Sequence, residues 1–127
     1  MCGGVRYELS EPFVSAGYCH CTRCQRRTGS AASASGRVAP GSLRIVAGAE
    51  LVREWRPEDG WVKASCSVCG SQLWSRDPDV AETVSVRLGT VDGDPGIRPQ
   101  YRQYVAYAAP WEPIPDDGLP RFDERRV

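Results

Sequence analysis

Apolar and polar side chains alternate in short stretches along this chain, and the alternation predicts β-strands. The clearest stretch is TVSVRL at residues 83–88, where valine or leucine takes every second position. A period of two is typical of a strand with one buried face. VRYEL at residues 5–9 follows the same pattern. Further strands are predicted at residues 13–18, 33–38, 43–46, 51–55, 61–66 and, rich in aromatic side chains, 100–107.

Glycine and proline separate these strands, and only one short helix is expected. The chain has 13 glycines and 10 prolines and no long stripe with a helical period. A helical turn is predicted at residues 22–28, with Gly29 as its C-terminal cap. Four prolines after residue 109 predict an extended tail. Together these signals predict an all-β sandwich or open barrel of short antiparallel strands, in a single domain spanning residues 1–127.

Composition and charge narrow the classes of function. Sixteen basic and sixteen acidic side chains give a formal net charge of zero, so no overall field attracts nucleic acid or an anionic membrane. No stretch has the ~20 apolar residues of a membrane helix, and the first residues do not resemble a signal peptide. We therefore expect a cytoplasmic protein, whose thiols stay reduced. Six cysteines in such a protein point to metal binding.

Three of the cysteines, Cys19, Cys21 and Cys24, lie within six residues. On a strand, Cys19 and Cys21 would share one face and His20 would point to the other. We therefore expect His20 to pack or to hydrogen-bond rather than to bind a metal. A turn after Cys21 can bring Cys24 back toward the first two thiols. Zinc favours such thiolate sets, and three protein ligands leave a fourth position open, as in reactive zinc sites.

A second cysteine motif is typical of a zinc knuckle. Cys66 and Cys69 are separated by two residues, and Gly70 permits the turn that wraps a metal. Cys2, which precedes a glycine pair, is the expected third partner. The two motifs together are a strong signal for zinc.

Spacing alone leaves other arrangements of these cysteines open. Three disulfides allow 15 pairings but need an oxidising compartment. A thioredoxin-type redox pair needs a βαβ context, which this strand-rich pattern lacks. A single structural site, built from one cysteine of the triplet with Cys66 and Cys69, is the main rival of two separate sites.

The motifs, in this order, resemble the glutathione-dependent formaldehyde-activating enzyme family, which also includes centromere protein V. The resemblance lies in CGGVRY at residues 2–7, YCHCTRCQRRTG at 18–29 and CSVCGS at 66–71. It continues in the tail, with APW at 109–111 and PDDGLPRF at 115–122. It therefore covers essentially the whole chain.

The resemblance implies a β-tent fold, a sandwich of β-sheets that holds up to two zinc ions. It assigns Cys2, Cys66 and Cys69 to a structural zinc and the triplet to a weaker, catalytic zinc. The chain departs from the family pattern in two places. The family usually opens with Cys-x-Cys-Gly, of which Cys2 supplies only the second cysteine. Arg102 stands where many members have a histidine in the last strand.

The implied activity is that of a carbon–sulfur lyase, which condenses glutathione or another thiol with formaldehyde or a related small aldehyde. Glutathione carries two carboxylates, so cationic partners are expected near the triplet, and Arg26 and Arg27 are the best candidates. A solvated helix face is the alternative for these two arginines. Trp74 is expected in the core rather than in the pocket wall. The rival function is a zinc-stabilised interaction module without catalysis.

Overall fold

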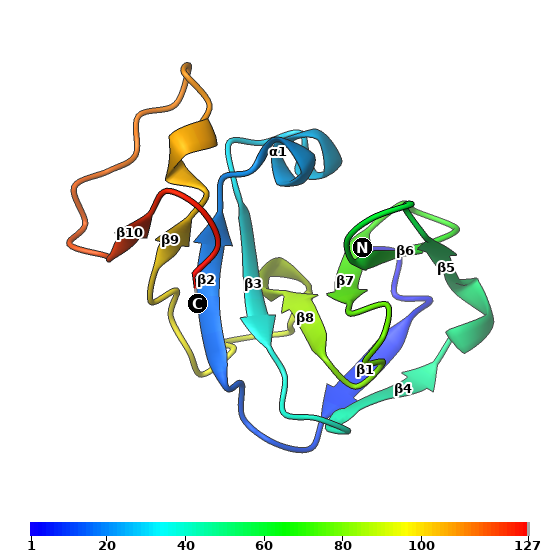
Figure 1. Ribbon diagram of the computed structural model, residues 1–127. Coiled ribbons are helices and arrows are strands. Elements are labelled where there is room, and N and C mark those ends of the chain that lie inside the picture. Colours follow the sequence, from blue (N-terminus) through cyan, green and yellow to red (C-terminus); the bar gives the residue numbers. More distant parts are fainter. Residues whose placement is uncertain (127) are drawn as a thin grey trace.

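The computed structural model describes residues 1–126, and it confirms an all-β fold with one α-helix (Figure 1). The larger sheet has eight strands in the order β10-β9-β2-β3-β8-β7-β6-β5, and the smaller sheet pairs β1 with β4. The strands are β1 (Arg6–Leu9), β2 (Ser15–Cys19), β3 (Ser33–Arg37), β4 (Leu43–Ala47), β5 (Val52–Trp55), β6 (Val62–Cys66), β7 (Gln72–Arg76), β8 (Val84–Arg87), β9 (Arg102–Gln103) and β10 (Arg121–Phe122). Within residues 1–126, no helix has the length and hydrophobicity that crossing a membrane requires.

The hydrophobic core lies on one face of the larger sheet, where the smaller sheet packs against it. Val84 and Val86 of β8 are buried there, as the alternation in this segment predicts. β1 and β4 contribute partly buried apolar side chains, including Tyr7 and Ile45. Trp74 is 4% exposed and meets Tyr7 edge to face, with ring centroids 5.9 Å apart. The prediction that Trp74 belongs to the core is therefore confirmed.

The other face of the larger sheet is polar over its central strands. Arg37 of β3 is paired with Ser85 of β8, Ser85 with Ser75 of β7, and Ser75 with Lys63 of β6. Because residues directly opposite one another share a face, these four side chains form a polar row across four strands.

Helix α1 (Thr22–Thr28) has the predicted bounds and the predicted cap. It connects β2 to β3 and lies at the ends of these strands (Figure 1). Cys21 is its N-cap, since the Cys24 backbone N–H donates a hydrogen bond to Cys21 Sγ. Gly29 ends the helix in the left-handed conformation, at φ 64°, and donates its N–H to the Gln25 carbonyl. The helix therefore fixes the spacing of Cys21 and Cys24.

The predicted strand at residues 100–107 is wrong for most of its length. Only Arg102–Gln103 forms a strand, and a 3₁₀-helix, Val105–Tyr107, begins after Tyr104. Tyr104 has a positive φ of 56°, which breaks the extended chain between them. β9 also runs parallel to β2 and to β10, so the expectation of antiparallel strands throughout fails at this edge.

Strand β7 was not predicted, because its residues do not alternate. Leu73, Trp74 and Ser75 are all buried. A register shift between Ala64 and Ser65 of the partner strand leaves Leu73 as the extra residue of a β-bulge. The bulge interrupts the period of two that sequence analysis depends on. Two more 3₁₀-helices, Ala49–Leu51 and Leu88–Thr90, also lack a clear sequence signal.

Candidate functional site

The cysteine triplet is assembled by the junction of β2 and α1. Cys19 is the last residue of β2, Cys21 caps the helix, and Cys24 lies in its first turn. The three Sγ atoms all lie within 4.8 Å of one another, and each cysteine is partly exposed. The local sequence thus places three partly exposed sulfur atoms around one point.

Positive charge and hydrogen bonds favour a thiolate in this triplet. The pKa of Cys24 lies far below the usual thiol value, because the Cys19 and Cys21 thiols and the Ser33 hydroxyl donate hydrogen bonds to its sulfur. The guanidinium of Arg87 acts in the same direction. Conversely, the pKa of Cys19 is raised, because its thiol hydrogen-bonds to the sulfur atoms of Cys21 and Cys24. The surroundings of the triplet therefore favour a thiolate, the form of cysteine that binds a metal.

The second group joins the N-terminus to the turn after β6. Cys2, Cys66 and Cys69 have Sγ atoms within 4.8 Å of one another. Gly70 has a φ of 75° and donates its N–H to the Cys66 carbonyl at 2.9 Å, which closes the predicted knuckle turn. Backbone hydrogen bonds from Ser71 and Cys2 lower the pKa of Cys69 to about 6.

Both groups fit a zinc ion. In a tetrahedral site with Zn–S bonds of ~2.3 Å, the sulfur atoms are about 3.8 Å apart. The Cys2 and Cys66 Sγ atoms are 3.7 Å apart. All six cysteines are free, so the thiols are available as ligands. No cysteine belongs to both groups, which separates the residues into two triads rather than one four-cysteine site.

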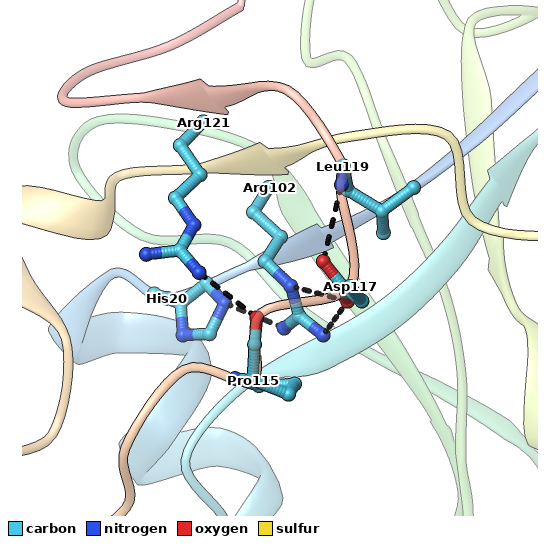
Figure 2. Close-up of polar contacts among 6 residues, drawn as sticks. All are labelled: His20, Arg102, Pro115, Asp117, Leu119 and Arg121. Carbon is cyan, nitrogen blue, oxygen red and sulfur yellow. Dashed lines mark hydrogen bonds and ion pairs between the residues drawn. The ribbon is translucent and has the colours of Figure 1, made fainter.

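His20 lies between two cysteines of the triplet but turns away from them, as predicted. It is 4% exposed, and its Nε2 lies 3.2 Å from Arg102 Nη1 (Figure 2). Arg102 in turn donates two hydrogen bonds to Asp117 Oδ2, at 2.8 and 3.2 Å. Arg102 therefore anchors the tail segment around Asp117 beside β2. It is the residue that stands where many members of the family have a histidine.

A cavity of about 590 Å³ opens beside the triplet. Its lining includes Cys19, Cys21 and Cys24 but none of the other three cysteines. The polar row of the larger sheet forms its floor, since Arg37, Lys63, Ser75 and Ser85 all line it. The volume suits a small organic ligand. Of the two cysteine triads, the triplet alone is thus placed to act on such a ligand.

The two arginines expected to bind substrate lie in different environments. Arg27 lines the cavity and donates hydrogen bonds to Ser75 Oγ at 3.0 Å and to the Ala64 carbonyl at 2.8 Å. Burial, together with the neighbouring charge of Arg87, lowers the pKa of Arg27 to about 10. Arg26 is exposed and is not part of the lining.

Several pocket residues were not singled out from the sequence. Tyr101, Tyr104 and Tyr107 form an aromatic side of the cavity. Tyr104 is the single non-glycine residue with a positive φ among residues 1–126, a conformation often found at functional sites. The interval of three residues between these tyrosines is the available signal, although the aromatic-rich segment as a whole predicts a strand. Arg125, from the tail, also lines the cavity.

Comparison with known proteins gives a family match and a structural relative. The sequence profile described as "Glutathione-dependent formaldehyde-activating enzyme" matches residues 1–107. A crystal structure of a Rhodobacter sphaeroides protein, a structural genomics target, is similar with a TM-score of 0.55 and 25% sequence identity. The similarity covers 95% of this chain and 94% of that one. No curated protein matches the sequence.

Proposed function

Since the chain belongs to the glutathione-dependent formaldehyde-activating enzyme family, we propose that it is a zinc-dependent carbon–sulfur lyase that joins a thiol to a small aldehyde. Glutathione and formaldehyde are the first pair to test. The observation that carries the proposal is that the triplet Cys19, Cys21 and Cys24 lines the cavity of about 590 Å³, whereas the second triad does not. A purely structural metal site has no need of such an opening.

The reaction forms one carbon–sulfur bond and needs no leaving group. The thiol sulfur attacks the aldehyde carbon, the carbonyl π-bond breaks, and the thiol proton ends on the oxygen of the hydroxymethyl product. A zinc ion held by the three thiolates would supply a Lewis acid that lowers the pKa of a bound thiol. The second triad, Cys2, Cys66 and Cys69, would hold a structural zinc.

The remaining pocket residues bind and orient the thiol in this proposal. Arg27 is held against the sheet by Ser75 and the Ala64 carbonyl, which leaves its guanidinium at a fixed place beside the triplet. A guanidinium is well suited to a carboxylate, with which it makes paired hydrogen bonds. Arg26, on the exposed side of the helix, remains a predicted second contact. Six free thiols also support the proposed cytoplasmic location, where they would stay reduced.

Exchange NMR of formaldehyde with glutathione tests this function, with and without catalytic amounts of the zinc-loaded protein. The adduct also forms spontaneously, so the observable is the acceleration above that background. We expect wild-type protein to accelerate the exchange and Cys21→Ser to lose the acceleration. Serine is a good N-cap, so this variant should keep helix α1, which circular dichroism checks.

Arg53→Ala is the matched control, because Arg53 is exposed on β5 and lies outside the pocket lining. It should accelerate the exchange as wild type does. If wild-type protein with two bound zinc ions gives no acceleration, the lyase assignment fails and the non-catalytic interaction module takes its place. If Cys21→Ser unfolds, the triplet is structural.

A further inference from the structure

The cavity beside the triplet is lined by cationic side chains and, among residues 1–126, by no carboxylate. The protein as a whole has as many acidic as basic residues, so this imbalance is local. The cationic lining residues come from α1, three strands and the tail: Arg23, Arg27, Arg37, Lys63, Arg87 and Arg125.

Most of these cations have no acidic partner. Arg23 is paired with Asp59 at 2.6 Å, at the exposed rim. Within the described part of the chain, the other five cations form no ion pair. By contrast, Arg23 and six arginines outside the cavity lining each pair with a carboxylate. Arg87 donates to Ser35 Oγ at 2.8 Å, and Arg37 lies over the Trp61 ring at 4.7 Å. Their Nε atoms are buried without a hydrogen-bond partner.

The sheet holds these charges in place. Lys63, Ser75, Ser85 and Arg37 stand side by side across four strands. Ser35 is paired with Arg87 on the same face, so the cavity floor carries both hydroxyl groups and cations. The hydroxyls can donate as well as accept, and the cations can only donate. The floor is therefore a surface of hydrogen-bond donors.

Gathering these cations costs free energy that an anionic ligand would offset. Burial, and then the charge of Arg27, lowers the pKa of Lys63. Burial and the charge of Arg87 do the same to Arg27. The thiolates of Cys21 and Cys24 offset this repulsion only in part, since the pKa of each cation is still lowered. Half-buried like charges without a carboxylate partner oppose folding, and they are typical of binding sites for the opposite charge. An ammonium group entering the cavity would instead meet repulsion and find no carboxylate.

We propose that this pocket selects a thiol that carries two or more anionic groups (carboxylate, sulfonate or phosphate) and no free ammonium. This inference rests on the proposed function, because it concerns the thiol that the same pocket would bind. Glutathione satisfies the first condition with its two carboxylates but violates the second with the ammonium of its glutamyl residue. The preferred thiol is therefore more acidic overall than glutathione.

Three matched thiols test the proposal with the zinc-loaded protein of 127 residues and formaldehyde. N-acetylglutathione lacks the ammonium and keeps both carboxylates, and glutathione diethyl ester keeps the ammonium and lacks both carboxylates. We expect the KM for N-acetylglutathione to be about tenfold lower than for glutathione, because one repulsive charge is removed. The KM for the diester should be higher than for glutathione, and kcat should change little.

Binding of the S-methyl derivatives of these compounds, measured by calorimetry, separates selectivity from catalysis. If the protein accelerates the exchange of formaldehyde with none of the thiols, but the N-acetyl derivative still binds most tightly, the proposed function fails and the selectivity stands. If the exchange is accelerated but glutathione is used as well as N-acetylglutathione or better, the selectivity is overturned and the proposed function stands.

Lys63→Met should remove much of the preference for N-acetylglutathione, because it deletes one central cation and keeps the length of the side chain. Arg53→Met, outside the pocket, is the control and should keep the preference. If Lys63→Met does not fold, Arg125→Met from the tail makes the same test. A preference that survives the loss of a pocket cation overturns the proposal.

Discussion

Two neighbouring arginines on one short helix have different surroundings, and the difference follows from the helical period. Arg27 points over the larger sheet, where Ser75 and the Ala64 carbonyl hold its guanidinium. Arg26, a 100° turn away, is exposed to solvent. A charge that is fixed and partly shielded from water interacts more strongly with a ligand than a mobile, hydrated one. Arg27 is therefore expected to contribute more to thiol binding.

We predict that Arg27→Ala raises the KM for an anionic thiol by about tenfold, since one charge-assisted hydrogen bond is lost. Arg26→Ala should change it less than twofold. Steady-state exchange NMR at a range of thiol concentrations gives both values. Thermal unfolding of each variant is needed alongside, because Arg27 also ties the helix to the sheet. Equal effects of the two substitutions would contradict this distinction.

At the scale of elements, the sequence predicts a segment well where a local signal and the tertiary contacts agree. Helix α1 has the predicted bounds because Gly29, a residue that readily takes the left-handed conformation, ends it as a C-cap. β8 was clear because its valines face the core and its polar residues face the pocket. The strand predicted at 100–107 is wrong for most of its length because Tyr104 takes a left-handed conformation, which is uncommon for tyrosine. That conformation depends on contacts distant in the sequence.

Helix α1 positions two of the three cysteines of the triplet, so its C-cap can be tested as part of the site. Gly29→Ala should lower the free energy of unfolding by about 1 kcal/mol, the cost of a left-handed conformation for a residue with a Cβ. No atom within 4 Å would obstruct that Cβ, so the effect would be one of backbone conformation alone.

Gly89→Ala is the matched control for this measurement. Its Cβ would also meet no atom within 4 Å, and its backbone is not left-handed. Alanine should therefore be neutral or slightly stabilising there. Urea denaturation of both variants gives the comparison, and a Gly29→Ala variant as stable as Gly89→Ala would show that the cap does not hold the helix end.

At the scale of the whole molecule, the site is built from parts that no local pattern connects. Cys2 lies next to Cys66 across 64 positions of sequence, so spacing identifies the two cysteine motifs and suggests Cys2 as a partner but leaves other groupings open. The resemblance to the family supports two separate groups, and the geometry agrees with it. Of the cations in the pocket, the sequence predicts only Arg27, because most of the others come from separate strands and the tail and are balanced by acids elsewhere.

The tail completes this pocket, and an ion pair between buried Arg102 and the more exposed Asp117 holds it. Arg102 is 7% exposed and lies between His20 and Asp117 (Figure 2). Beyond Asp117, backbone hydrogen bonds run from the Arg102 N–H to the Pro120 carbonyl and from the Tyr104 N–H to the Glu124 carbonyl. These contacts bring Arg125, the next residue, to the cavity. The stability of the tail and the charge of the pocket are therefore linked.

We predict that Asp117→Asn loosens the tail at about pH 7, because it leaves the Arg102 charge buried without a counter-ion. Amide hydrogen exchange at Arg102 and Tyr104 should become faster, by a factor on the order of ten, while exchange in β6 and β8 stays as in wild type. Exchange that is equally slow in the variant would contradict the role of the ion pair.

The pH dependence gives this prediction a second, independent test. Hydrogen bonds from Arg102 lower the pKa of Asp117 below its usual value of 3.8, so the folded protein keeps the carboxylate ionised to lower pH than the unfolded chain does. Its contribution to stability is therefore complete above pH 3.8 and is lost as the pH falls from there through the lowered pKa. Wild type and Asp117→Asn should differ in tail exchange near neutral pH and converge in acid, and effects of acid common to both proteins cancel in the comparison. A difference in tail exchange that persisted below the pKa values of Asp117 in both the folded and the unfolded protein would contradict this. Asparagine would then disturb the tail by its shape rather than by its missing charge, and the pocket would depend on packing around Arg102 instead of on the ion pair.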